Sequence, residues 1–362
     1  MSDHKEAKSF SRFGYIMVAA GAAIGLGNIW KFPYLAYGDG GGAFVLIYIV
    51  ICILLGHPIV QAEQAVGRRG RASAAASYGV IHPKWRFVGV INIVCTFLID
   101  IYYLVVSGWV LKYFVTYVVS GDFGKDKQAY FDNYISSTTQ PLIYSLVIIA
   151  IIVFFLFFGI TNIVEKASKV IMPMLAVLLL VCGIYALIVV PGAVDGLKYY
   201  FVPDFSKFGM QQFADACMQV CFSVGIGWGI FTTLGASMDK DANLKADAWW
   251  VDICDTFIAL LAGFVIIPTV VGTGSEMSSG PSLVFVAMTQ IFETLPGGRI
   301  IGIFFFASLI FAVISTFFTI LEIPRMYVQE KTHTSHQVSL IITAALAVSY
   351  THLRAHETDQ YL

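Results

Sequence analysis

The chain alternates between long apolar runs and short polar or Gly/Pro-rich breaks. A bilayer core of about 30 Å needs roughly 20 apolar residues per helix, and the chain contains eight complete runs of that kind and a ninth that is cut short. We expect the N-terminal run to be a membrane span rather than a cleavable signal peptide, because it is long, interrupted by glycines and followed at once by another run. We therefore expect an all-α integral membrane protein with helices at residues 13–37, 41–66, 87–119, 141–158, 166–190, 213–236, 247–272 and 298–328, and an incomplete one at 337–350.

The composition supports this reading and excludes other classes. The chain is 58% hydrophobic and 12% charged, about half of the roughly 25% charge of soluble domains. A formal charge of −1 provides no attraction for a polyanion, so we expect no nucleic-acid partner. The six cysteines lie in apolar runs without a CxxC pair, which indicates reduced, buried thiols rather than a zinc or redox site.

The basic residues predict the orientation in the membrane. Cytoplasmic loops carry an excess of Lys and Arg, and such residues gather before the first run and between the second and third. We therefore expect a multi-pass protein of the cytoplasmic (inner) membrane with a cytoplasmic N-terminus. The basic residues concerned are Lys5, Lys8, Arg12, Arg68, Arg69, Arg71, Lys84 and Arg86.

Two runs are expected to break in the middle of the membrane. The first holds three glycines, an Asn, a Lys and a Pro between Gly21 and Pro33, and the sixth is similarly glycine-rich from Phe222 to Gly229. In a helix interior Gly costs about 1 kcal/mol relative to Ala and Pro about 3. Unwound backbone at membrane depth is tolerated where it lines a cavity, and paired interruptions point to a transporter's binding site.

A broken helix offers ligands for both charges of a zwitterion and for a cation. Half-helix N-termini suit a substrate carboxylate, and freed carbonyls suit a hard cation. The alternative is that Gly21 and Gly25, four residues apart, are packing positions of the GxxxG type. Asn28 and Ser223 favour a binding site, because buried polar groups in lipid need partners.

Other polar residues inside the runs carry different weight. A carboxylate at a helix centre costs at least ~2.5 kcal/mol on insertion scales, so Asp100 and Asp255 each need a partner, and Asp255 is the better functional candidate. For Glu322 a structural hydrogen bond and transport chemistry both stay open. Ser315 and Thr316 taken alone are typical of helix back-bonding.

Several segments closely resemble the neurotransmitter:sodium symporter family, and the resemblance extends over roughly residues 10 to 345. The Glu322–Pro324 ending is similar to bacterial members. The matching segments are Gly21–Pro33, Gly40–Phe44, Ile101–Tyr103, Gly159–Lys169, Pro203–Phe205, the broken sixth run, Asp255–Gly263 and Ala312–Pro324.

The resemblance implies sodium-driven inward transport of amines or amino acids by alternating access. The implied fold has two inverted five-helix repeats with discontinuous helices 1 and 6. It divides the chain into a cytoplasmic N-terminus (1–12), a first repeat (13–190), an extracellular connector (191–212), an incomplete second repeat with helices 6–9 (213–348) and a polar tail (349–362). The tail interrupts an apolar run, and our hypothesis is a truncated or chimeric reading frame.

Two sodium sites follow from the resemblance, both made of oxygen ligands as a hard cation requires. The first uses the Ala23 carbonyl with Asn28, Ser223 and Asp255, completed by the substrate carboxylate. The second uses the carbonyls of Gly21, Ile24 and Ala312 with the hydroxyls of Ser315 and Thr316.

The resemblance also implies the substrate site and the gates. The substrate carboxylate would meet the amides of Leu26 and Gly27 and the Tyr103 hydroxyl, and its ammonium the carbonyls of Ala23, Phe222, Ser223 and Gly225. The side-chain pocket would comprise Ile99, Phe222, Trp228, Thr316 and Ile320. Gate residues would be Lys31, Tyr103 and Phe222 outside and, pairing with Lys5 or Lys8, Glu330 inside.

Three positions predict specificity. Monoamine-transporting members carry an Asp where this chain has Gly25, so the substrate must supply its own carboxylate, and we expect an α-amino acid, apolar or aromatic. Asp255 stands where many relatives have Asn, and Ala259 where animal members have a chloride-supporting Ser. We therefore expect no chloride requirement.

Two other functions remain as alternatives. A truncated symporter that inserts without transporting is one, since the implied second repeat is incomplete. An intramembrane enzyme using Asp100, Asp255 or Glu322 is the other, disfavoured because there is no HExxH or GxSxG motif.

Overall fold

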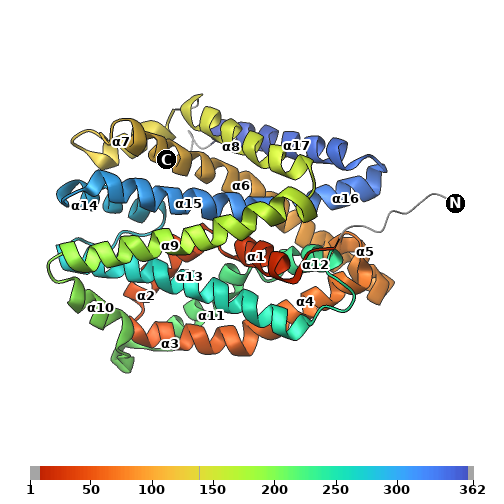
Figure 1. Ribbon diagram of the computed structural model, residues 1–362, viewed down its shortest axis with the longest axis horizontal. Coiled ribbons are helices and arrows are strands. Elements are labelled where there is room, and N and C mark those ends of the chain that lie inside the picture. The colour runs from red at the N-terminus through yellow and green to blue at the C-terminus, as the bar shows by residue number, and fades with distance from the viewer. Residues whose placement is uncertain (1–8, 138, 358–362) are drawn as a thin grey trace.

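The structure is a computed structural model that describes residues 9–137 and 139–357. The long helices run roughly side by side along the longest axis of the molecule, and short helices lie at both ends (Figure 1). One end carries α5 and α16, while the other carries α7, α10 and α14.

The first half of the chain forms the following elements. Its first span is a helix, a π-helical turn and a second helix, and its second span continues through another π-helical turn. The bounds are α1 Arg12–Ala23, turn Gly27–Lys31, α2 Phe32–Gly38, α3 Gly42–Ile51, turn Cys52–Gly56, α4 His57–Gly70, α5 Ala74–Ile81, α6 Arg86–Val119, α7 Lys127–Ile135, α8 Thr139–Phe157, turn Ile160–Val164 and α9 Glu165–Val189.

The second half begins with the short helix α10 and then the sixth span, which is split into two helices. Its bounds are α10 Ala193–Phe201, α11 Met210–Val224, α12 Ile230–Ala236, α13 Leu244–Thr273, turn Leu283–Ala287, α14 Met288–Thr294, α15 Gly298–Ile320, α16 Glu322–Thr332 and α17 His336–Glu357.

The all-helical membrane architecture expected from the apolar runs is confirmed. Within the described residues, 6 spans are long and apolar enough to cross a membrane, and the bent first span makes a seventh. The sixth run is absent from this group because its two helices have only 15 and 7 residues. The apolar part of α17 covers His336–Ser349, and the helix continues to Glu357.

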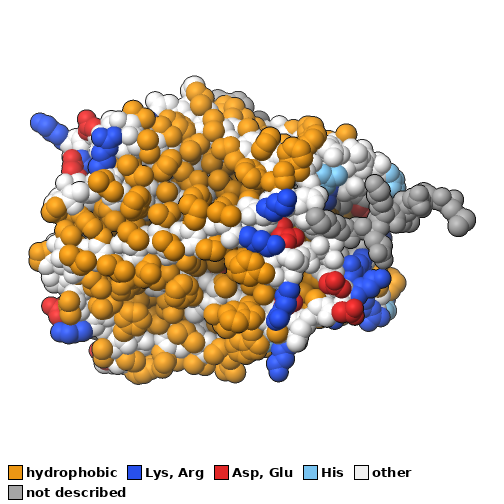
Figure 2. All heavy atoms as spheres, viewed as in Figure 1, with side chains coloured by type: hydrophobic (Ala, Val, Ile, Leu, Met, Phe, Trp, Pro, Cys, Tyr) orange, Lys and Arg blue, Asp and Glu red, His pale blue; other side chains and the backbone are white. Residues whose placement is uncertain are grey.

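The face of the bundle in Figure 2 is a broad hydrophobic surface, with charged side chains gathered toward its two ends. Leu98, Ile143 and Val177 are among the exposed apolar side chains on the long helices. A contiguous apolar surface of this extent suits contact with lipid rather than water.

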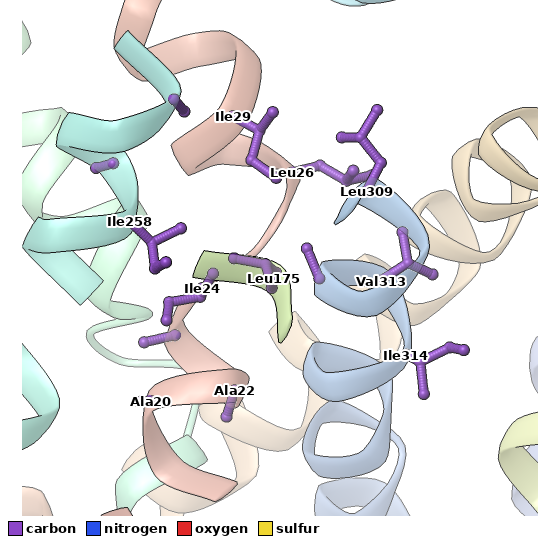
Figure 3. Packing of buried hydrophobic residues seen from close by; sticks show 14 of the residues in the cluster. Ala20, Ala22, Ile24, Leu26, Ile29, Leu175, Ile258, Leu309, Val313 and Ile314 are labelled. Atoms are coloured by element: carbon purple, nitrogen blue, oxygen red, sulfur yellow. The ribbon is translucent and has the colours of Figure 1, made fainter. Parts of the chain in front are cut away.

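The first span lies at the centre of the bundle, where α1 packs against α9, α13 and α15. Figure 3 shows Ile24 close to Leu175 of α9 and Ile258 of α13. Small residues allow this close approach: a Cβ atom at Gly21 would lie 2.8 Å from the Ser315 Cβ.

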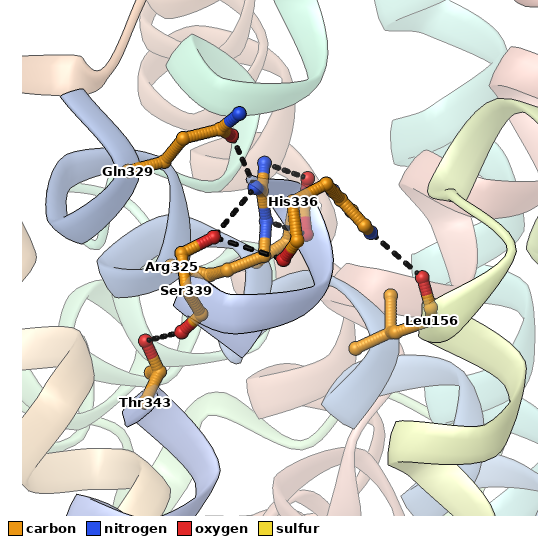
Figure 4. A network of polar contacts seen from close by, with 7 residues as sticks. Leu156, Arg325, Gln329, His336, Ser339 and Thr343 are labelled. Carbon is orange, nitrogen blue, oxygen red and sulfur yellow. Dashed lines mark hydrogen bonds and ion pairs between the residues drawn. The ribbon is translucent and has the colours of Figure 1, made fainter. Parts of the chain in front are cut away.

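A buried polar network holds α17 against its neighbours (Figure 4). Arg325 donates to both carboxylate oxygens of Glu322 at 2.6 Å and to Ser339 Oγ of α17 at 3.3 Å. His336 Nε2 lies 2.8 Å from the Leu156 carbonyl of α8. Glu322 is thus held in a bidentate ion pair with Arg325, which favours a structural role over transport chemistry for this residue.

Candidate functional site

The first span is interrupted between α1 and its π-helical turn. The helix ends at Ala23, Ile24 has extended backbone (φ −71°, ψ 93°), and the two helical parts are bent by 61°. The carbonyls at the end of α1 and the amides that begin the next turn are therefore released from regular helical bonding. This break lies where the glycine pattern predicted it.

The sixth span is interrupted by three glycines in the left-handed region. Gly225, Gly227 and Gly229 have φ values of 70°, 80° and 79°, which L side chains rarely adopt. The predicted break is confirmed. Buried Glu63 of α4 accepts a hydrogen bond from the Gly227 amide at 2.9 Å.

Asn28, Ser223 and Asp255 converge in one buried cluster. Asn28 donates to Asp255 Oδ1 at 2.7 Å and to Ser223 Oγ at 2.9 Å. Ser223 donates to Asp255 Oδ2 at 2.8 Å, and the Tyr48 hydroxyl donates to Ser223 at 3.2 Å. The first, sixth and seventh spans are thus joined by side chains whose oxygens suit a hard cation.

A second group of oxygens lies between α1 and α15. Thr316 Oγ1 lies 3.2 Å from the Gly21 carbonyl, 2.9 Å from that of Ile24 and 3.0 Å from that of Ala312. Ser315 Oγ lies 2.9 Å from the Ala312 carbonyl. The structure therefore brings together the five residues implied for the second sodium site.

A cavity of about 300 Å³ lies beside both groups. Asn28 and Thr316 line it, so it adjoins both oxygen clusters. All the residues implied for the substrate site border it except Ile320, which is fully buried outside the lining. The residues that line the cavity are Ala22, Ala23, Gly25, Leu26, Gly27, Asn28, Trp30, Lys31, Ile99, Tyr102, Tyr103, Phe222, Ser223, Gly225, Trp228 and Thr316.

Phe222 and Lys31 lie at one side of this cavity. The Lys31 ammonium lies 4.6 Å from the centroid of the Phe222 ring, and that ring meets Trp228 edge-on at 5.4 Å. A Cβ atom at Gly27 would lie 2.4 Å from Phe222, so the aromatic ring packs directly on the broken first span.

Two acidic side chains lie near each other where α2 ends and α11 begins. Asp39 follows α2, and burial together with the neighbouring Asp215 carboxylate of α11 raises the pKa of Asp39 to about 6. Asp215 also acts electrostatically on Lys31.

At the opposite end of the bundle, Glu330 and Arg12 each have a partner. Glu330 accepts from Ser73 Oγ at 2.5 Å and lies 3.5 Å from Arg86, whereas its expected partners Lys5 and Lys8 lie outside the described residues. Arg12, at the start of α1, forms an ion pair of 2.8 Å with buried Asp247.

Sequence reasoning missed Glu63, Tyr48 and the Arg12–Asp247 pair. A usable signal existed for Glu63, since a carboxylate in an apolar run needs a partner. Tyr48 carried no such signal, because an aromatic residue is common in a membrane helix. The Asp247 pairing depends on how α13 packs against α1, which no local pattern reveals.

A bundle of membrane helices in which two interrupted spans meet at a cavity flanked by oxygen clusters defines a class. It is that of secondary transporters with discontinuous helices.

The comparisons with known proteins identify the family. The family model described as "Sodium:neurotransmitter symporter family" matches residues 7–121 and 131–355. The chain belongs to this family of transporters, which are not enzymes.

Bacterial relatives cover most of the chain. It is 33% identical over 348 residues to an uncharacterised sodium-dependent transporter of Haemophilus influenzae, covering 92% of this chain and 76% of the relative. A second such transporter, from Bacillus subtilis, is 34% identical over 328 residues, covering 89% and 72%.

A solved structure confirms the transporter fold. The crystal structure of MhsT in complex with L-phenylalanine matches with a TM-score of 0.88 and 33% identity, covering 96% of this chain and 80% of that one.

Proposed function

We propose that the protein transports a zwitterionic amino acid with an apolar or aromatic side chain, together with sodium, by alternating access. The observation that carries the proposal is the convergence of Asn28, Ser223 and Asp255 beside the cavity. One carboxylate among neutral oxygens suits a monovalent hard cation, and the broken spans supply the dipoles for a zwitterion.

Two sodium ions are assigned to the two oxygen groups. The first binds at Asn28, Ser223 and Asp255 with the Ala23 carbonyl, and the bound substrate carboxylate completes its shell. The second binds between α1 and α15 at the carbonyls around Thr316. Because substrate and the first ion share a contact, each strengthens the binding of the other.

The substrate lies in the cavity with its carboxylate toward the amides of Leu26 and Gly27 and the Tyr103 hydroxyl. A Cβ atom at Gly25 would lie 3.4 Å from that hydroxyl, so this position faces the carboxylate subsite without supplying an anion of its own. Ile99, Phe222 and Trp228 form an apolar wall for the side chain. The similar transporter MhsT was crystallised in complex with L-phenylalanine, which supports an aromatic substrate for this chain as well.

Alternating access uses closures at the two ends of the first span. At the outer end Phe222 and Lys31 cover the cavity, and at the inner end Arg12 pairs with Asp247. We assign the inner end to the cytoplasm, with the N-terminus inside, because the loop from Arg68 to Arg86 carries the excess of basic residues.

The test is binding of radiolabelled L-phenylalanine to the purified chain in detergent, with sodium replaced by potassium or choline. We expect saturable binding that requires sodium and not chloride, and its loss in Asp255→Ala. The matched control is Glu276→Ala, since Glu276 is exposed in the loop that follows α13 and does not line the cavity. Sodium-independent binding contradicts the proposal.

Uptake into proteoliposomes separates the symporter from the alternative of a non-transporting fragment. We expect uptake driven by an inward sodium gradient and abolished when the gradient is collapsed. Sodium-dependent binding without uptake supports the fragment.

A further inference from the structure

A second cavity of about 300 Å³ lies at the end of the bundle that carries α7 and α14 (Figure 1). It is bordered by the last turn of α6, the start of α7, α14 and the start of α15, and we call it the α6–α14 pocket. It shares no lining residue with the substrate cavity. Tyr103 of the substrate cavity and Tyr117 of the α6–α14 pocket are about 21 Å apart along α6.

Two buried hydroxyl groups border this pocket without hydrogen bonds. Tyr117 of α6 is 3% exposed and Thr289 of α14 is 1% exposed, and both side chains line the pocket. The two hydroxyls lie near each other, but their geometry is not that of a hydrogen bond and neither has another partner among the described residues. A buried hydroxyl without a partner is unfavourable, so this pair is suited to donate to a ligand in the pocket.

The charged side chains that line the pocket carry a net positive charge. Lys127, at the start of α7, is 6% exposed, and its ammonium lies 2.5 Å from the carboxylate of Glu293. These two charges cancel. Arg299, at the start of α15, donates through Nε and Nη2 to three backbone carbonyls at the end of α6, while its Nη1 has no hydrogen-bond partner among the described residues. Because the carbonyls are neutral groups, the positive charge of Arg299 is not balanced by a lining side chain.

The remaining side chains offer an apolar surface. Phe123, Phe292 and Leu295 line the pocket, and the Tyr117 ring packs on Phe123 with centroids 4.7 Å apart. The side chain of Glu293 is 62% exposed, so the pocket is open to solvent at this end. Apolar walls with a few polar groups are typical of small-molecule sites, and this volume is at the lower end of their range of about 300–1,000 Å³.

These features select one class of ligand. A carboxylate only accepts hydrogen bonds, so it can accept from both hydroxyls and from the guanidinium, and its charge balances that of Arg299. A cation would meet a net positive charge instead. A chloride ion would leave most of the volume and the apolar surface uncovered, whereas an apolar body attached to the carboxylate covers both.

We propose that the α6–α14 pocket binds a small monocarboxylate with an apolar body, at a site separate from the substrate cavity. The carboxylate accepts hydrogen bonds from Tyr117 and Thr289 and faces the guanidinium of Arg299, while the apolar body contacts Phe123 and Phe292. The inference rests on the residues of this pocket and does not require the proposed transport function.

The measurement is equilibrium dialysis of radiolabelled phenylacetate against the full purified chain in detergent and potassium buffer. Phenylacetate carries a carboxylate and an apolar ring but lacks the ammonium group of an amino acid. We expect saturable binding of one molecule per chain. Phenethylamine, which places an ammonium on a similar ring, and chloride at the same concentration should not compete. Saturating phenylacetate should leave sodium-dependent phenylalanine binding unchanged, because the two cavities share no lining residue.

Two variants remove one hydroxyl each and keep the shape of the side chain. Tyr117→Phe and Thr289→Val each remove one hydrogen bond to a charged group, so we expect phenylacetate to bind about ten- to a hundredfold more weakly. Their thermal unfolding midpoints should not fall, because these hydroxyls are unpaired in the free protein. The matched control is Tyr113→Phe, which removes a buried, unpaired hydroxyl one turn earlier on α6 and outside the pocket, and it should keep the parent affinity.

The possible outcomes decide the inference separately from the proposed function. An absence of saturable binding, or equal affinity in the parent, Tyr117→Phe and Thr289→Val, would overturn it. Competition between phenylacetate and sodium-dependent phenylalanine binding would place the carboxylate in the substrate cavity and also overturn it, and competition by chloride would indicate a site for inorganic anions instead. Loss of sodium-dependent phenylalanine binding in every preparation, with phenylacetate binding as expected, would contradict the proposed function alone.

Discussion

The first and sixth spans are interrupted beside the same cavity, but their backbones depart from the helix in different ways. In the first span, Ile24 leaves the helix with extended backbone and its residues keep negative φ. In the sixth, Gly225, Gly227 and Gly229 all adopt positive φ. The first break therefore accepts side chains on conformational grounds, whereas the sixth requires glycine.

The two breaks also differ in what stabilises them. Asn28 and Thr316 hold the first break with side chains that belong to the oxygen clusters. Glu63 holds the sixth from outside, through the Gly227 amide. In the first break, the side chains that stabilise the backbone are thus also the proposed ion ligands. In the sixth, glycines adopt the required backbone conformation and a side chain of the neighbouring helix α4 stabilises it.

The largest effect is expected where both breaks meet, at Asp255. Asp255→Ala removes the one carboxylate among the side chains proposed to bind the first sodium ion, and a contact with a charged group contributes about 1.5–3 kcal/mol. We expect sodium affinity to fall about a hundredfold or more, measured as the sodium concentration for half-maximal phenylalanine binding. Unchanged sodium dependence would show that the two spans do not share an ion.

Glu63→Ala is expected to loosen the sixth break selectively. It removes the acceptor of the part-buried hydrogen bond from the Gly227 amide, a loss of about 0.5–1.5 kcal/mol. A lower midpoint of thermal unfolding for the detergent-purified protein checks this. Glu63→Gln retains an acceptor oxygen and should recover part of the loss. Equal effects of both substitutions would mean that the charge of Glu63, and not its acceptor oxygen, stabilises the break.

Gly227→Ala and Gly25→Ala compare the two backbones directly. A Cβ atom at Gly227 meets nothing within 4 Å, so its cost is the left-handed conformation alone, about 1–2 kcal/mol. At Gly25 the φ is permissive, but a Cβ would lie 3.4 Å from the Tyr103 hydroxyl. We expect Gly227→Ala to lower thermal stability and Gly25→Ala to weaken amino-acid binding at unchanged stability; the reverse pattern would overturn the comparison.

The smallest effect concerns Asp39, which follows α2 and lies near Asp215 of α11. Because the folded protein raises the pKa of Asp39 from 3.8 to about 6, it binds a proton more tightly than the unfolded chain. The contribution of Asp39 to stability is therefore present at low pH and is lost as pH rises through about 6. Asp39→Asn should be slightly more stable than the parent at pH 7, with the difference vanishing near pH 4, in thermal unfolding across pH.

Much of the site was predictable because glycine, proline and polar residues are uncommon inside an apolar membrane helix and are easily recognised there. Glycines and a proline in an apolar run predict a break on energetic grounds, and Asn28 beside them needs a partner. The partners themselves, Ser223 and Asp255, were assigned through the family resemblance. The geometry brings these three together as that resemblance implied.

The remaining features depend on packing between distant segments. Ile320 lies one turn beyond Thr316 on the same face of α15, yet it is fully buried and outside the cavity lining. His57 of α4 pairs with Asp252 of α13, 195 positions away in the sequence, and no pattern near either residue predicts this pairing. Such contacts are fixed by how whole helices pack rather than by local pattern.

The most direct measurement is a crystal structure of the protein grown with phenylalanine and thallium(I), a heavy monovalent cation that replaces sodium and is located by its anomalous scattering. The account predicts one peak among Asn28, Ser223 and Asp255, touching the phenylalanine carboxylate, and a second between Ile24 and Thr316. The account would be contradicted by thallium bound elsewhere while phenylalanine occupies the cavity and the hydrogen bonds within each oxygen group remain in place.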